Sequence, residues 1–166
     1  MDWRAVTTYT QVFDIQSSCV LILDLWETSV NSSNNTSVLN WSAKVKRTVG
    51  WVATTFSWEI SGDVTGSGSA SVTMNAGDSH TLSSGSTTLT HEPDGSKSVW
   101  VEVWADNPGH VGGAWIGEDF DLTTIATTSA VATITSYTNP WTLDKQKTIS
   151  INKPSQTTTH CLLWWK

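Results

Sequence analysis

Hydrophobic and polar residues alternate with a period of two in a series of short runs along the first 125 residues. In the run that begins at Cys19, for example, Leu21, Leu23 and Leu25 fall on one side of an extended chain. Period-two alternation with turn residues between the runs is typical of an antiparallel sandwich or barrel. The runs predict about seven strands, at residues 19–25, 39–45, 52–60, 70–74, 87–90, 97–105 and 120–125.

The strongest turn signal lies between the fifth and sixth of these runs. In the sequence His91-Glu92-Pro93-Asp94-Gly95, proline presets φ for a type I turn and glycine suits the left-handed position that follows. This signal predicts a β-hairpin that joins residues 87–90 to residues 97–105, with His91 forming local hydrogen bonds at the turn. A second loop, at residues 107–113, contains three glycines and leads to the last predicted strand.

The composition restricts the class of protein. Hydrophobic residues make up 38% of the chain and 11 residues are tryptophan, so the chain can bury a core. The apolar runs are far shorter than the ~20 residues that a membrane-spanning helix needs, and we expect no membrane insertion. The net charge of −6 argues against a nucleic-acid partner, because phosphate binding needs clustered lysine and arginine.

Charge divides the chain near Ala126. Residues 1–126 contain 5 basic and 14 acidic residues, whereas residues 127–166 contain 4 basic residues and 1 acidic residue. Residues 127–166 also carry only three short strand candidates, which are too few to close a sandwich. We therefore predict one β-sandwich module at 1–126, followed at 127–166 by a linker and the truncated start of a second β-repeat.

Several cysteine and tryptophan residues are predicted to lie inside the protein. Cys19 and Cys161 lie in apolar runs near opposite ends of the chain, so we expect small buried thiols and no disulfide. Trp41 and Trp58 share the apolar sides of their runs and are predicted to be core residues. His, Cys and carboxylate residues do not cluster at the spacing of a metal site, and we expect neither a metal nor a cofactor.

A resemblance to a known family covers most of residues 51–125. Its motifs are Gly66-Ser67-Gly68, residues 82–87, residues 90–97 and a Val/Trp strand that closes on residues 120–125. These motifs resemble the β-sandwich repeats of siphophage minor structural and receptor-binding tail proteins, although Ala126-Thr127 stands where that family often has Pro-Arg. The resemblance implies an immunoglobulin-like antiparallel β-sandwich, repeated along a tail fibre. It also implies localisation in the virion tail, with assembly in the host cytoplasm.

Tryptophans in the run at 97–105 provide the candidate functional surface. The valines of this run face one way, whereas Trp100, Glu102 and Trp104 face the other, with the two indoles about 13 Å apart by strand geometry. Indole faces pack against the C–H faces of pyranose rings, and a carboxylate accepts hydrogen bonds from sugar hydroxyls. His110 and Trp115, beside the glycine-rich loop, would extend this surface. The alternative is that these tryptophans pack against a neighbouring repeat, a loop or a second subunit.

These features predict a non-catalytic phage tail structural and adhesion module that contributes to binding of a host cell-wall saccharide. Its predicted partners are host cell-surface polysaccharide and other tail subunits, and a homo-oligomer is left open. One alternative is a carbohydrate-binding module of a bacterial wall-associated or secreted protein, although Met1-Asp2-Trp3-Arg4 does not begin an export signal. Another is a glycoside hydrolase that uses Glu102 with Glu59, because such enzymes need paired carboxylates about 5 to 10 Å apart.

Overall fold

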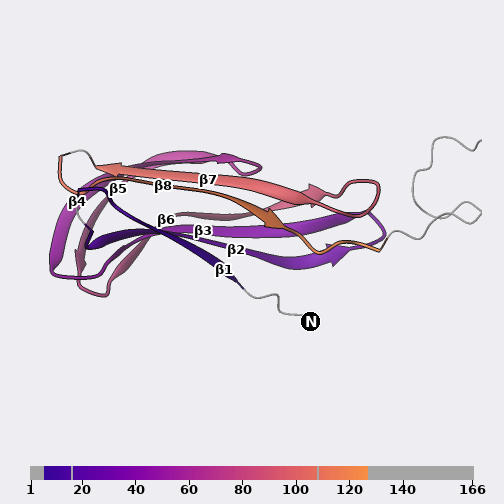
Figure 1. Ribbon diagram of the computed structural model, residues 1–166, viewed down its shortest axis with the longest axis horizontal. Coiled ribbons are helices and arrows are strands. Elements are labelled where there is room, and N and C mark those ends of the chain that lie inside the picture. The colour runs from indigo at the N-terminus through magenta and orange to yellow at the C-terminus, as the bar shows by residue number, and fades with distance from the viewer. Residues whose placement is uncertain (1–5, 16, 108, 127–166) are drawn as a thin grey trace, which may run out of the picture.

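The computed structural model describes residues 6–15, 17–107 and 109–126. These residues form eight antiparallel strands in two four-stranded sheets that face each other as a β-sandwich (Figure 1). The strands are β1 (Thr7–Val12), β2 (Cys19–Asn31), β3 (Thr36–Arg47), β4 (Trp51–Gly62), β5 (Gly66–Asn75), β6 (Ser79–Thr90), β7 (Ser98–Asn107) and β8 (Gly112–Asp121). We name the sheet with the order β1-β2-β3-β6 the β1 sheet, and the sheet with the order β5-β4-β7-β8 the β8 sheet.

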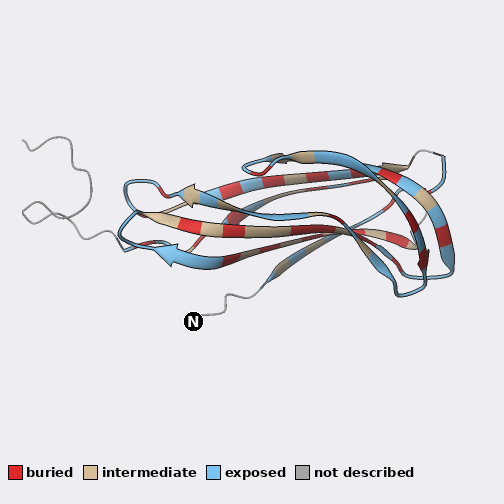
Figure 2. Cartoon of the chain, turned by 180° about the vertical axis from the view of Figure 1, so that it is seen from behind, coloured by how far each residue is buried: buried red, intermediate tan, exposed pale blue. Residues whose placement is uncertain are grey.

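The core lies between the two sheets, where β2, β7 and β8 bury alternate side chains over most of their length (Figure 2). On β2, Leu21, Leu23 and Leu25 are completely buried, while the residues between them are only partly covered. The rings of Phe13 and Phe56 meet inside the sandwich with their centroids 5.4 Å apart. Burial of one leucine or phenylalanine side chain stabilises the folded state by about 1.5–3 kcal/mol relative to exposure. Burial of the alternating apolar side chains is therefore the main source of stability.

The prediction of an all-β sandwich is confirmed, but the described residues form eight strands where the sequence predicted about seven. The strand β1 was missed because it lies at a sheet edge and its residues are mostly exposed, so its sequence lacks an apolar alternation. The edge strand β6 is longer than residues 87–90 for the same reason. The last strand begins at Gly112, inside the predicted loop, and ends at Asp121, before Ile125.

The predicted hairpin between β6 and β7 is wrong. The strand β6 pairs with β3, whereas β7 pairs with β4 and β8, so residues 91–97 cross from one sheet to the other. The turn itself forms as expected: Gly95 has a φ of 84°, and its N–H donates to the Glu92 carbonyl at 2.8 Å. His91 is buried there and forms the expected local hydrogen bond, through Nδ1 with the Gly95 carbonyl at 2.8 Å, and a second, non-local one through Nε2 with the Ser37 hydroxyl of β3 at 2.7 Å.

The predictions for the interior are confirmed in part. Cys19 is a completely buried free thiol, as expected. Trp41 and Trp58 are partly buried and pack against the core. Each covers a glycine on the neighbouring edge strand, since a Cβ atom added to Gly85 or Gly68 would come within 2.5 or 2.8 Å of the respective indole ring. Cys161 and the predicted second repeat at 127–166 lie outside the described residues.

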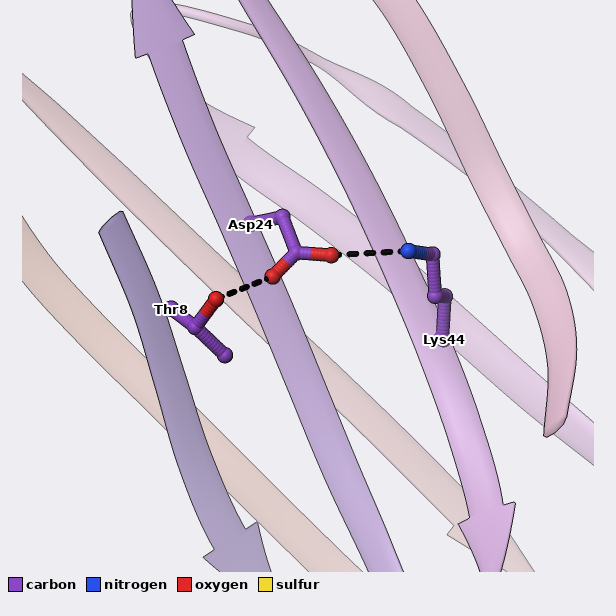
Figure 3. A network of polar contacts seen from close by, with 3 residues as sticks. All are labelled: Thr8, Asp24 and Lys44. Carbon is purple, nitrogen blue, oxygen red and sulfur yellow. Dashed lines mark hydrogen bonds and ion pairs between the residues drawn. The ribbon is translucent and has the colours of Figure 1, made fainter. Parts of the chain in front are cut away.

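A charged network crosses the outer face of the β1 sheet (Figure 3). Asp24 on β2 lies between Thr8 on β1 and Lys44 on β3. The Thr8 hydroxyl donates to one carboxylate oxygen at 2.6 Å, and the Lys44 ammonium donates to the other at 2.7 Å. The carboxylate is therefore occupied by partners within its own sheet.

Candidate functional site

The outward side chains of β7 form the centre of the candidate site. Val99, Val101 and Val103 are completely buried, so the residues between them point away from the core. Trp100 is 38% exposed and Trp104 is 39% exposed. The structure therefore confirms that the valines and the tryptophans of β7 face opposite sides of the strand. Neither Trp100 nor Trp104 is part of the core.

Pairing between strands brings Trp115 to the same face. Trp104 on β7 is directly opposite Trp115 on β8, and Trp115 is 51% exposed. The sequence suggested Trp115 only because it lies close to the glycine-rich loop, whereas the structure places it on a strand beside Trp104. We refer to the outer surface of the β8 sheet around Trp100, Trp104 and Trp115 as the tryptophan face.

Gly117 provides the space that two of these indoles occupy. A Cβ atom at this position would lie 2.5 Å from Cζ2 of Trp115 and 2.8 Å from Cζ2 of Trp100. Both rings therefore extend over the backbone of β8 at a position that lies opposite Glu102. Gly117 was not among the predicted site residues, and the pattern Trp115-Ile116-Gly117, with a small residue on the same side as a tryptophan, was the available signal.

The backbone of Trp100 is fixed by the loop that follows β4. The Trp100 N–H donates to the Asp63 carboxylate at 2.8 Å, and the Asp63 N–H donates to the Trp100 carbonyl at 2.9 Å. The Lys97 ammonium lies 3.7 Å from the other oxygen of the same carboxylate. Gly62 has a φ of 101°, and a Cβ there would lie 2.2 Å from the Trp100 carbonyl oxygen, so this position requires glycine.

Two glutamates and a serine complete the face. Glu59 on β4 is opposite Trp104, and Ser61 is opposite Glu102, so the two glutamates occupy diagonal positions on neighbouring strands. A hollow of about 190 Å³ is lined by Glu59, Ser61, Glu102, Trp104 and Trp115. From the sequence, Glu59 was a candidate only as a catalytic partner, because spacing along the chain could not place it beside the tryptophans.

His110 is the one predicted site residue that the structure does not bring to the tryptophan face. It is exposed in the loop between β7 and β8, and its N–H donates to the Asn107 carbonyl at 3.1 Å. The pairing of β7 with β8 ends at Asn107 and Gly112, so His110 lies in the loop beyond the paired strands that carry the tryptophan face.

A second depression lies at the side of the sandwich, where the edge strands β1 and β8 approach each other. This groove of about 580 Å³ is lined by residues of both strands, including Tyr9 and Trp115. Partial burial raises the pKa of the Tyr9 phenol above its ordinary value of 10.0, and the negative charges of Glu118, Asp119 and Asp121 raise the pKa further. Three carboxylates of β8 therefore lie close enough to the Tyr9 phenol to affect its ionisation.

The described residues contain no helix long and apolar enough to cross a membrane. Within the same part of the chain, His, Cys, Asp and Glu side chains do not gather in groups of three or more that could hold a metal ion. No protein-family model matches the chain, and comparisons with curated proteins and with solved structures gave no match.

Proposed function

We propose that the protein is a non-catalytic saccharide-binding module of a phage tail, which contributes to host attachment by binding cell-wall polysaccharide. The tryptophan face is the observation that carries the binding part of this proposal: three indoles are 38%, 39% and 51% exposed on one side of a single sheet. Exposed aromatic side chains grouped on one face are typical of a binding surface. The motifs within residues 51–125 that resemble siphophage tail repeats support the assignment to a tail.

The arrangement of the face suits a chain of sugar rings. Indole rings present apolar faces to the C–H groups of a pyranose, while the carboxylates of Glu59 and Glu102 and the hydroxyl of Ser61 can bind sugar hydroxyls. The side chains project from paired strands, so little backbone ordering opposes binding. A single face of this size binds weakly, but several copies on one tail would bind a polymeric wall strongly through avidity.

Calorimetric titration of the 166-residue chain with solubilised cell-wall polysaccharide tests the proposal. The double substitution Trp100→Ala/Trp104→Ala should weaken binding about 100-fold, because each buried aromatic contact contributes on the order of tenfold. Trp51 is a matched control, since it is 68% exposed on the same sheet but lies at the start of β4, outside the segment that pairs with β7. Trp51→Ala should retain the affinity, and equal losses in both variants would contradict a site at the tryptophan face.

A glycoside hydrolase is the second candidate, because Glu59 and Glu102 line the same hollow. Release of reducing ends from the same polysaccharide distinguishes the two functions. A hydrolase would lose turnover on Glu102→Gln while its melting temperature stayed unchanged, since Glu102 lies on the outer face. The binding module should release no reducing ends in either form.

A carbohydrate-binding module of a bacterial wall protein would use the same face, and tail and lysis genes beside the reading frame would argue against it.

A further inference from the structure

The four strands of the β8 sheet have no positive charge. The structure describes β4, β5, β7 and β8 completely, and none of their residues is lysine, arginine or histidine. Their outward positions nevertheless include the carboxylates of Glu59, Glu102, Asp106 and Asp119. Any ligand that lies along the tryptophan face therefore meets negative charge and no compensating cation from the sheet itself.

The two glutamates of the hollow are available to a ligand. Lys97, which precedes β7, is directed to Asp63 at 3.7 Å, and neither Glu59 nor Glu102 is ion-paired to a described residue. Both carboxylates border the same hollow as the indoles of Trp104 and Trp115. An organic cation in that position would interact with two carboxylates and with the indoles of Trp104 and Trp115.

We propose that the hollow binds the ammonium group of an amino sugar whose amine is free, so that the tryptophan face selects wall saccharides by charge. The proposal rests on the proposed function and adds the chemical class of the ligand. A primary ammonium group has three donors for the carboxylates and is attracted to the indole faces, whereas an N-acetyl group offers one donor and no charge. An anionic polymer is disfavoured because like charges face each other across the interface.

Three oligosaccharides of equal length test this selectivity by calorimetric titration of the 166-residue chain at pH 6. They are an oligomer of glucosamine, its fully N-acetylated counterpart and an oligomer of galacturonate. The glucosamine oligomer should bind about tenfold more tightly than the N-acetylated oligomer, and the galacturonate oligomer should bind most weakly. The preference for the free amine should decrease in 0.5 M salt but persist, because the indole contacts and partial desolvation are less sensitive to screening.

Substitution of the carboxylates locates the selectivity. Glu59→Gln and Glu102→Gln should each reduce the preference for the free amine several-fold while leaving binding of the N-acetylated oligomer within about twofold. Glu92→Gln is the matched control, because it removes one exposed carboxylate in the loop between β6 and β7. If Glu92→Gln reduced the preference equally, the selectivity would come from the overall negative charge of the chain and the proposal would be wrong.

The outcomes separate this proposal from the proposed function. Equal affinity for the amine and N-acetyl oligomers, with binding still dependent on Trp100 and Trp104, overturns only the charge selectivity. Failure of all three oligomers to bind while cell-wall polysaccharide still binds overturns the amino-sugar proposal alone, and failure of the polysaccharide as well overturns both proposals. Displacement of the glucosamine oligomer by choline at equal concentration shows that the hollow recognises an ammonium group without a sugar ring, and this result overturns the assignment to an amino sugar.

Discussion

On the outer face of the β1 sheet, Asp24 is held by Lys44 and Thr8, whereas on the outer face of the β8 sheet Glu59 and Glu102 lie beside exposed indoles without a cation from their own strands. Strands of the β1 sheet contain lysine, arginine and histidine, and strands of the β8 sheet contain none. A carboxylate with partners in its own sheet contributes to the fold. Carboxylates left beside aromatic rings on a solvent-exposed surface are available to a partner outside the chain.

The same difference applies to the glycines beneath tryptophan rings. Gly85 on β6 lies under Trp41, which packs against the core, and Gly117 on β8 lies under Trp115 and Trp100, which face solvent. A half-buried ring has little room to move when its glycine acquires a side chain, whereas an exposed ring can turn outward. Substitutions in the two sheets should therefore separate stability from binding.

The largest expected effect comes from the pair Gly85→Ala and Gly117→Ala. The new Cβ in Gly85→Ala would lie 2.5 Å from the Trp41 ring, and overpacking there should lower the free energy of unfolding by about 1–3 kcal/mol without changing saccharide affinity. In Gly117→Ala the exposed rings should move outward, so stability should change by less than about 0.5 kcal/mol while affinity falls about tenfold. Urea unfolding and calorimetric titration measure the two quantities.

A reversed result for this pair would contradict the division of roles between the sheets. If Gly117→Ala lost more stability than Gly85→Ala, the exposed indoles would belong to the fold and not to a binding surface. If Gly85→Ala lost affinity at unchanged stability, the site would extend to the opposite sheet.

A smaller effect is expected from the charged network of the β1 sheet. Asp24→Asn should lower the free energy of unfolding by up to about 1 kcal/mol, because the ion pair with Lys44 is partly exposed and therefore partly screened. A double-mutant cycle with Lys44→Gln isolates the coupling, which should decrease in 1 M salt. Saccharide affinity should stay unchanged in all three variants, and a coupling of zero would show that the pair contributes nothing to the fold.

The smallest effect is expected at the side of the sandwich, where Tyr9 of the β1 sheet faces Asp119 of the β8 sheet. Burial and nearby carboxylates raise the pKa of the Tyr9 phenol above 10.0, so its neutral form is favoured in the folded state. This contribution is fully present below pH 10 and is lost as the pH rises through the raised pKa. The midpoint of urea unfolding should therefore fall between about pH 9 and pH 11 less steeply in Tyr9→Phe than in the parent chain. Parallel curves would contradict the prediction.

Much of the fold followed from patterns that are local in the sequence. Alternation of Leu21, Leu23 and Leu25 on β2 identified a buried side, and the same rule separated the valines of β7 from Trp100 and Trp104. Alternation works because successive side chains of a strand point to opposite faces whichever strand lies beside it. The strand β1 and much of β6 could not be recognised in this way, since exposed positions on both sides leave them without a periodic signal.

The predicted hairpin at residues 91–97 shows that turn residues alone do not predict which strands pair. Turn chemistry at Gly95 was interpreted correctly, and its φ of 84° and the hydrogen bond to Glu92 are present. A turn, however, determines only the path of a few residues. Whether the strands on either side pair with each other depends on contacts with β3 and β4, which are distant in the sequence.

The sequence by itself determined that the chain forms a β-sandwich and that Trp100, Glu102 and Trp104 share the side of β7 opposite the valines, because these properties arise from a period of two along one strand. Tertiary structure alone decided that Trp115 lies opposite Trp104, that Gly117 makes room for the indoles and that Glu59 joins Glu102 at one hollow. These contacts depend on the register between strands, and register is fixed only when the two sheets bury their apolar sides together.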